Sequence, residues 1–396
     1  MFNAAWLTAL PWVAPLFGLV RLARTKPSLS DVPPVTGVPV SVIVPARNES
    51  GQIETVLRSV LASSHTPLEV IVVDDRSTDD TASKVAAMVR TDARLRLVEG
   101  RALPRSWYGK PWACQQGADA ATGDVLLFTD ADTKHHPELV SRAVSMLRQT
   151  KADLLTVAPK QLVLSFWERV IMPQVWVMLG LRYHPDRVNA STKPWGVIAN
   201  GQFMMFARAS YDAIGGHAAV RGEVVEDLAM AQRVVGLGKK LYFAFAYDLM
   251  ETRMYQNLQQ LIEGWSKNVF IGSRISFGRN PVLRFLAPIG MALNAVFWLA
   301  PPVVLAAATL GYAAPLLVPA AIATALSLVF WSMISFGMQV PAWYGLIYPL
   351  GASMFLWIMA RSAWRGTRRV EWRGRVYDEV TGIATEPAPP STPARG

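Results

Sequence analysis

The chain is poor in the residues that build thiolate and imidazole metal sites. Cys114 is the only cysteine among 396 residues, so a disulfide framework and a cysteine-based zinc site are both excluded. The histidines His135, His136, His184 and His217 form no spacing typical of a metal site. These absences leave carboxylates as the candidate metal ligands.

Motifs of nucleic-acid binding are also missing. The sequence has no helix-turn-helix, zinc-finger or aromatic ribonucleoprotein pattern. The formal net charge is nevertheless +10, from 39 Lys and Arg against 29 Asp and Glu. Much of this positive charge lies beside apolar segments, where membrane topology and anionic lipids account for it. Nucleic acid is therefore not expected as a partner.

Charge is absent from two long segments, 1–20 and 285–360. In the first, the basic residues Arg21, Arg24 and Lys26 follow the apolar run, and no small-residue cleavage site is near. A cleaved signal peptide has its basic residues before the apolar run, so we expect residues 1–23 to be an uncleaved membrane segment. Its prolines leave a kinked or partly inserted helix open. By the positive-inside rule, the domain that follows lies in the cytoplasm.

The second uncharged segment is long enough for about three crossings of roughly 20 residues each. We divide it into 285–307, 315–336 and 341–360, within a membrane region that covers 285–361. Arginines flank both ends of this region, which places both ends in the cytoplasm and requires an even number of crossings. One segment is then re-entrant or interfacial, or the region holds four short spans. The tail 362–396 is expected to be basic at first and then disordered.

Strand and helix patterns alternate between the membrane segments. Runs of β-branched and other apolar residues predict strands at 38–45, 68–73, 94–99 and 125–128. Helical spacing of apolar residues predicts helices at 49–63, 79–90 and 113–121. This alternation is typical of a doubly wound α/β domain, with a parallel sheet covered by helices on both faces.

Carboxylates follow two of the predicted strands. Asp74 and Asp75 end the second strand, and Asp130 and Asp132 follow the fourth. Ligands of such sheets bind outside the carboxyl ends of the strands. Two carboxylates two residues apart point the same way in an extended chain, and Mg²⁺ is usually held by one or two carboxylates plus substrate phosphates. The pattern predicts a site for a metal ion and a diphosphate-bearing substrate.

Several motifs along the predicted domain carry a resemblance to a known family. They are Val-Ser-Val-Ile-Val-Pro-Ala-Arg-Asn-Glu at 40–49, Val-Asp-Asp-Arg-Ser-Thr-Asp-Asp-Thr at 73–81, Phe-Thr-Asp-Ala-Asp at 128–132, Ile-Gly-Gly-His at 214–217 and Val-Glu-Asp-Leu-Ala at 225–229. Together they resemble family 2 glycosyltransferases, which have the GT-A fold, and they imply such a domain over 36–270. The run Met254-Tyr255 and Glu263-Gly264-Trp265-Ser266-Lys267-Asn268 resembles the membrane-bound subgroup that glycosylates carotenoid, hopanoid or ceramide-type lipids.

The resemblance implies roles for the residues that follow the first two strands. Pro45, Arg47 and Glu49 would meet the nucleotide sugar. Asp74 or Asp75 would contact the nucleoside, and the choice between them stays open.

The remaining motifs imply the metal site and the catalytic groups. Asp130 and Asp132 match the metal-binding DxD motif, which takes Mg²⁺ or Mn²⁺, and Asp130 also borders the nucleotide sugar. Lys110 precedes a predicted helix, where it can contact phosphate. Asp227 matches the general base of the family, and Glu226 is a neighbour that can raise its pKa or hold it in place.

The sequence departs from the processive branch of the family near Trp265. That branch carries Gln-x-x-Arg-Trp, whereas here Gly264 stands before the tryptophan. Single transfer is therefore favoured, with Trp265 bordering the nucleotide sugar and Lys267 replacing the lost cationic contact to phosphate. Segments 162–183 and 251–284 mix aromatic, apolar and basic residues, which predicts interfacial helices.

The expected function is that of a membrane-bound inverting glycosyltransferase. It would move one hexose from a nucleotide sugar, a UDP-sugar in the first place, to a membrane lipid at the cytoplasmic face of the bacterial inner membrane. A processive polysaccharide synthase, a polyprenyl-phosphate sugar transferase and a catalytically silent nucleotide-sugar-binding subunit are the alternatives. A silent subunit is disfavoured because Asp130, Asp132 and Asp227 are all present.

Overall fold

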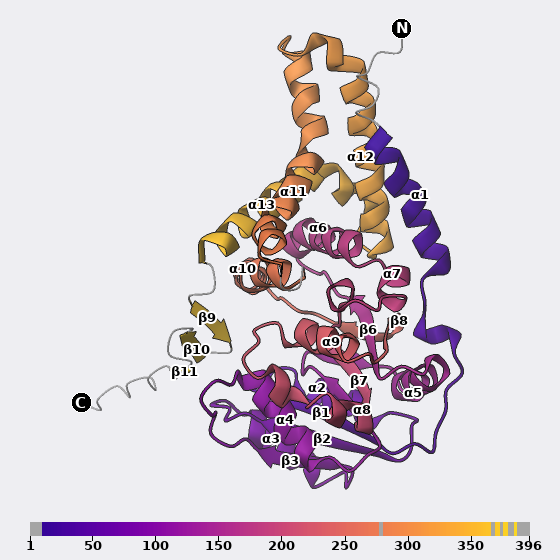
Figure 1. Cartoon of the computed structure of the whole chain (residues 1–396), viewed down its shortest axis with the longest axis vertical. Coiled ribbons are helices and arrows are strands. Elements are labelled where there is room, and N and C mark those ends of the chain that lie inside the picture. The colour runs from indigo at the N-terminus through magenta and orange to yellow at the C-terminus, as the bar shows by residue number, and fades with distance from the viewer. Residues whose placement is uncertain (1–9, 277–279, 366–368, 373–374, 379–383, 386–396) are drawn as a thin grey trace, which may run out of the picture. The chain divides into compact units, whose positions relative to one another are not determined.

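The chain forms two compact units, each assembled from segments that are distant in the sequence (Figure 1). The computed structural model describes residues 10–276, 280–365, 369–372, 375–378 and 384–385. One unit, the sheet unit, comprises Leu29–Pro159, Val188–Thr252 and Arg365–Gly396. The other, the helical unit, comprises Met1–Ser28, Lys160–Arg187 and Arg253–Trp364.

The sheet unit is built on an eight-stranded mixed sheet of order β3-β2-β1-β4-β7-β6-β8-β5. Four neighbouring strands are parallel, as the sequence predicts: β1 (Val40–Ala46), β2 (Leu68–Asp74), β3 (Leu95–Glu99) and β4 (Val125–Thr129). Beyond β4, the pairings of β4 with β7, of β7 with β6 and of β8 with β5 are antiparallel, and the predicted parallel sheet did not include these last four strands. These strands are β5 (Thr133–His135), β6 (Leu154–Gln161), β7 (Phe203–Ala207) and β8 (Leu241–Thr252).

Helices cover both faces of the parallel half of the sheet. Val40, Val42 and Val44 share one buried cluster with α2 (Ile53–Leu61) and α5 (Leu139–Thr150). On the other face, Ile71 and Val73 pack against Ala113 of α4 (Gly109–Ala120). Because successive side chains of a strand point to opposite faces, a continuous apolar strand needs both layers. The remaining helical segments of the unit are α3 (Thr81–Val89), α8 (Arg208–Ala213), α9 (Glu226–Gly236) and the 3-10 turns η2 (Leu29–Asp31), η3 (Pro194–Gly196) and η4 (His217–Val220). The division of the chain between Arg187 and Val188 falls within the short α7 (Pro185–Asn189).

The predicted helix 113–121 begins four residues earlier than expected, at Gly109. Pro111 lies in the first turn, where a helix needs no backbone N–H, so the proline permits the earlier start. As a consequence Lys110 belongs to the first turn of α4 instead of the preceding loop.

The helical unit contains α1 (Leu10–Thr25), α6 (Phe166–Arg182), α10 (Leu258–Ile275), α11 (Pro281–Thr309), α12 (Leu317–Gly337) and α13 (Tyr348–Arg365), with 3-10 turns at η5 (Ala314–Leu316) and η6 (Ala342–Ile347). The two segments expected to be interfacial form α6 and α10. Three helical stretches are long and apolar enough to cross a membrane: Pro281–Thr309, Ala314–Gly337 and Ala342–Trp364. They correspond to the three predicted segments.

Parts of the predicted terminal segments lie outside the described residues. Of the N-terminal membrane segment, residues 1–9 are not described, and α1 covers the rest. Within the predicted tail, the structure describes the short antiparallel strands β9 (Arg369–Trp372), β10 (Arg375–Asp378) and β11 (Ala384–Thr385). Residues 386–396 are likewise outside the described part.

Candidate active site

Side-chain hydrogen bonds connect the loop that follows β1 to the loop that follows β2. Arg47 is buried, and its Nη1 donates to the carbonyl oxygens of Asp75 at 2.6 Å and Arg76 at 3.0 Å. Asn48 accepts from the backbone N–H of Thr78 at 2.8 Å through its Oδ1. Arg47, which we expect at the nucleotide sugar, therefore holds the backbone of the loop that follows β2.

Asp74 lies at the end of β2, beside these loops. Its Oδ2 accepts from the backbone N–H of Ser77 at 3.2 Å, while its Oδ1 is buried and makes no hydrogen bond among the described residues. A buried carboxylate oxygen without a donor is costly, so this position suits an N–H or O–H group of a ligand. Asp75 is fully buried. Pro45 lies within buried β1, and the backbone N–H of Glu49 donates to Thr81 Oγ1 at 2.8 Å.

The acidic turn, residues 130–132, connects β4 to β5. Hydroxyl groups hold its backbone, because Thr133 Oγ1 donates to the Asp130 carbonyl at 2.8 Å and Thr252 Oγ1 to the Asp132 carbonyl at 3.1 Å. The Asp130 and Asp132 side chains are partly exposed. The turn is thus fixed through its backbone.

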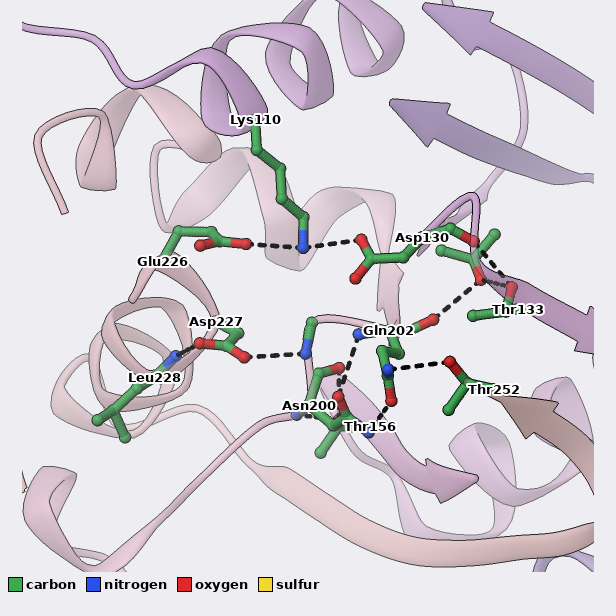
Figure 2. A network of polar contacts seen from close by, with 12 residues as sticks. Lys110, Asp130, Thr133, Thr156, Asn200, Gln202, Glu226, Asp227, Leu228 and Thr252 are labelled. Carbon is green, nitrogen blue, oxygen red and sulfur yellow. Dashed lines mark hydrogen bonds and ion pairs between the residues drawn. The ribbon is translucent and has the colours of Figure 1, made fainter. Parts of the chain in front are cut away.

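Lys110 joins the acidic turn to the start of α9 (Figure 2). Its Nζ lies 2.7 Å from Asp130 Oδ1 and 2.9 Å from Glu226 Oε1. Burial by itself would lower the pKa of Lys110, but the two carboxylates outweigh it and hold this pKa well above the usual value. The lysine is therefore a fixed positive charge between two predicted parts of the site.

Asp227 occupies the first turn of α9. Its Oδ2 accepts from the backbone N–H of Gly201 at 3.0 Å, and its Oδ1 accepts from that of Leu228 at 2.7 Å (Figure 2). Burial, and then the neighbouring Glu226 carboxylate, raise the pKa of Asp227 to about 6, while Lys110 opposes the rise. A carboxylate with such a pKa is ionised at neutral pH and basic enough to accept a proton.

Sequence reasoning missed the loop 200–202, which lies between these groups. A Cβ on Gly201 would lie 3.0 Å from Lys110 Nζ and 3.2 Å from Asp227 Oδ2, so a methyl group there would crowd both charged side chains. The only signal was the Asn-Gly dipeptide before the apolar run of β7, which reads as an ordinary turn.

His217, in the Gly-Gly-His motif, is a core residue. Its ring is fully buried, packs edge-on against Phe128 and lies with Nδ1 2.8 Å from the Tyr211 hydroxyl. Burial lowers the pKa of His217 to about 3, so the ring is neutral. This motif supports the strand that carries the acidic turn.

Trp265 is placed by the structure in the core of the helical unit. It is buried on α10, beside Tyr255 and Trp176, and its Nε1 lies 3.4 Å from Met172 Sδ. A Cβ on Gly264 would meet the Tyr255 ring at 2.5 Å, so the arginine of the processive branch has no room here. The side chain of Lys267 lies outside what the structure describes.

The residues of the acidic turn fit a hard divalent cation that is only partly held by protein. Among the described residues, no group of three or more His, Cys, Asp and Glu side chains gathers as a metal site. Two carboxylates from one turn are the oxygen ligands that Mg²⁺ or Mn²⁺ takes together with substrate phosphates and water. The ammonium group of Lys110 already lies against one of these carboxylates, so a metal ion would share Asp130 with the lysine.

The fold is that of GT-A glycosyltransferases. It is shared with a mannosyltransferase from Pyrobaculum calidifontis, solved in complex with GDP-Man and Mn2+, at a TM-score of 0.53 and 20% sequence identity over 91% of this chain and 98% of that chain. A family model, Glycosyl transferase family 2, matches residues 41–215. The match covers less than half of the chain, and over those residues the chain is similar to this family.

A curated relative is similar over part of the chain. The 4,4'-diaponeurosporenoate glycosyltransferase of Staphylococcus aureus is 27% identical over 239 residues, which cover 59% of this chain and 61% of that protein. The match thus spans less than two thirds of the relative's length. The resemblance expected from the motifs is thus supported by the family model over residues 41–215 and by the similarity to this relative.

Proposed function

We propose that this protein is a glycosyltransferase that moves a single hexose from a nucleotide sugar, a UDP-sugar in the first place, to a hydroxyl or carboxyl group of a membrane lipid. The transfer would invert the anomeric carbon and take place at the cytoplasmic face of the bacterial inner membrane. One observation carries the proposal: Lys110 contacts Asp130 and Glu226 at once, and Asp227 lies beside Glu226. A candidate metal ligand, a fixed cation and a candidate base thereby converge at one site.

The donor is expected along the carboxyl ends of the parallel strands. Asp74 would accept a hydrogen bond from the nucleoside, and Asp130 and Asp132 would hold Mg²⁺ or Mn²⁺ against the diphosphate. When bound, the cation would neutralise charge that develops on the leaving diphosphate. Lys110 is close enough to Asp130 to add a second positive charge there.

Asp227 is the proposed general base. In an inverting transfer, the acceptor oxygen attacks the anomeric carbon, a new carbon–oxygen bond forms, and the bond to the diphosphate breaks. Where the acceptor is a hydroxyl, its proton passes to the Asp227 carboxylate, whose pKa of about 6 leaves it ionised at neutral pH. Glu226 supports this basicity through its negative charge, and Lys110 balances the pair.

A lipid acceptor is supported by the character of the chain outside the site. Three helical stretches are apolar and long enough to cross a membrane. The similar protein from Staphylococcus aureus is named for transfer to diaponeurosporenoate, a carotenoid carboxylate. The packing of Tyr255 over Gly264, in place of the arginine of processive enzymes, supports a single transfer.

The proposal is tested by measuring release of UDP from UDP-glucose with detergent-purified protein and Mg²⁺ or Mn²⁺. Reactions with and without a bacterial lipid extract are compared for the wild type, Asp227→Asn and the control Asp212→Asn, an exposed carboxylate of the same unit. We expect lipid-dependent release, with radiolabelled glucose entering the organic phase. Asp227→Asn should reduce it at least ~100-fold, and Asp212→Asn should leave it unchanged.

Other outcomes would overturn parts of the proposal. Label in an insoluble polymer would establish a processive synthase, and transfer to a polyprenyl phosphate would redefine the acceptor. Binding of nucleotide sugars without release of nucleotide from any of them would establish a silent subunit.

A further inference from the structure

The acidic turn and Asp227 are two parts of the proposed site that come from segments distant in the sequence. The acidic turn follows β4, whereas Asp227 begins α9. Catalysis needs both to be held in fixed geometry, because an error of about 1 Å in such a site costs on the order of 100-fold in rate. A buried chain of hydrogen bonds joins them (Figure 2).

Thr252 and Gln202 form the centre of this chain. Gln202 Nε2 donates to Thr252 Oγ1 at 3.2 Å, and the same hydroxyl donates to the Asp132 carbonyl at 3.1 Å. Gln202 is 4% exposed and Thr252 is 2% exposed. Because the Thr252 hydroxyl uses its single proton on the acidic turn, its orientation is determined by both partners.

A second connection runs through the backbone of Gln202. Its carbonyl accepts from Thr129 Oγ1 at 2.9 Å, and that hydroxyl lies 3.2 Å from Thr133 Oγ1 and 3.1 Å from His135 Nε2. Thr133 in turn donates to the Asp130 carbonyl at 2.8 Å. Both ends of the acidic turn are thereby connected to one residue.

At its other end, the chain reaches the proposed base. Gly201, which precedes Gln202, donates its N–H to Asp227 Oδ2 at 3.0 Å. Asn200 anchors the loop from behind, because its N–H donates to Thr156 Oγ1 at 2.8 Å and its Nδ2 contacts Gln202 Oε1 at 3.2 Å. A shift of the loop 200–202 would therefore break hydrogen bonds to Asp227 or to the residues that hold the acidic turn.

We propose that Gln202 and Thr252 are positioning residues that hold the acidic turn and Asp227 at the separation the sugar transfer requires. The catalytic use of this separation rests on the proposed function. The hydrogen-bond chain itself does not depend on that function. Neither side chain needs to touch substrate. In a buried setting such a network is rigid, and losing one member leaves other buried polar groups without partners.

The test removes the Thr252 hydroxyl and measures both dynamics and rate in the full-length protein. The variants are Thr252→Val, the conservative Thr252→Ser, and Ser41→Ala as a control. Ser41 carries a fully buried hydroxyl in the same sheet, which donates to Glu69 Oε1 and accepts from the Gly123 N–H. It lies near the first residue of β1, whereas the candidate site follows the last residues of the parallel strands. Melting temperature is recorded for all of them.

Hydrogen–deuterium exchange gives a readout that needs no activity. We expect a peptide spanning residues 198–206 to exchange faster in Thr252→Val, but not in Thr252→Ser or Ser41→Ala. Unchanged exchange in Thr252→Val would overturn the inference, whether or not the wild type transfers sugar.

Kinetics separate positioning from simple loss of stability. We expect Thr252→Val to lower kcat by ~10- to 100-fold with the donor KM within about threefold, and Thr252→Ser to recover most of the rate. Equal rates in Thr252→Val and Ser41→Ala would overturn the inference and leave the proposed function intact. A wild type that transfers nothing would instead overturn the proposed function, and the exchange result would still decide the inference.

Discussion

At the scale of single residues, the electrostatics around Asp227 predict how the proposed sugar transfer responds to pH. Burial and Glu226 raise the pKa of Asp227 to about 6, and the base must be ionised to accept a proton. Activity should therefore fall as the pH decreases through about 6. We expect an ascending limb near pH 6 in kcat/KM for the donor, measured between pH 5 and 9. A profile that is flat from pH 5 to 7 would contradict Asp227 as the base.

Removing the charge of Lys110 should move this limb in a defined direction. Lys110 lowers the pKa of Asp227 through its positive charge, so Lys110→Met should shift the limb to higher pH. The donor KM should rise as well, since the cation next to Asp130 is lost. Lys134→Met, which removes an exposed lysine from β5, is the control. A limb that stays in place would show that Lys110 does not act on the base.

Gly201 offers a test of close packing between the proposed groups. In Gly201→Ala, the new methyl group would lie 3.0 Å from Lys110 Nζ and 3.2 Å from Asp227 Oδ2. The flexible lysine can yield, so we expect little change in melting temperature, but kcat should fall by ~10-fold or more as the pair is displaced. Gly222→Ala is the matched control, because a Cβ there meets nothing closer than 3.8 Å. Full activity in Gly201→Ala would mean that the site tolerates a wider spacing.

At the scale of secondary-structure elements, the start of α6 is fixed by a capping box. Ser165 Oγ accepts from the Glu168 N–H at 3.3 Å, and the Ser165 N–H donates to Glu168 Oε2 at 2.6 Å. Arg253 also donates to both oxygens of Glu168, at 3.2 and 3.0 Å. The box therefore ties the helix to the segment that follows β8.

We expect Ser165→Ala to destabilise the helical unit by about 1 kcal/mol and Glu168→Gln by more, because the latter also breaks the ion pair between the buried Glu168 and the partly exposed Arg253. Thermal unfolding in detergent measures both, with the exposed Ser83→Ala on α3 as the control. Burial raises the pKa of Glu168, but Arg253 and the cap outweigh it and lower the pKa overall. This contribution to stability is present above the usual glutamate pKa and is lost as the pH falls through the lowered value. If Glu168→Gln matched Ser165→Ala at neutral pH, the ion pair would contribute nothing.

At the scale of the whole molecule, the arrangement and burial of the helices in the helical unit predict how many times the chain crosses the membrane. Figure 1 shows α11 and α12 as an antiparallel pair, whereas α13 runs obliquely to them. The buried share rises from 17% in the first candidate span to 44% in the third. Ala352, Phe355 and Ile358 of α13 share a buried cluster with residues of α6. These features favour two membrane crossings, by α11 and α12, with α13 at the membrane interface. The basic segments before α11 and after α13 would then lie on the same side of the membrane.

Cysteine accessibility tests this topology, since Cys114 is buried and can be removed as Cys114→Ser. Tyr312, between α11 and α12, is 88% exposed, and Trp364, at the end of α13, is 93% exposed. With an impermeant maleimide on intact spheroplasts, we expect Tyr312→Cys to be labelled and Trp364→Cys to be labelled only after permeabilisation. Labelling of Trp364→Cys from outside would establish three crossings.

Local patterns predicted much of the parallel half of the sheet unit. The strands β1, β2, β3 and β4 lie within about two residues of their predicted bounds, because each is a short apolar run closed by polar residues. The other half of the sheet, with its antiparallel pairings, was not predicted. Its strands pair across long sequence separations, as β4 does with β7, and such pairings leave no local signature.

The sequence by itself determined which chemical groups are present and where they fall along the chain: carboxylates at the ends of strands, a Glu-Asp pair opening a helix, and uncharged segments long enough for membrane spans. Apolar periodicity and charge are local properties, so they can be read without the fold. Only the tertiary structure decided that Lys110 bridges Asp130 and Glu226, and that Gly201 bonds Asp227. Those contacts join β4, α4, α9 and the loop before β7, and distances between such elements exist only once the sheet has formed.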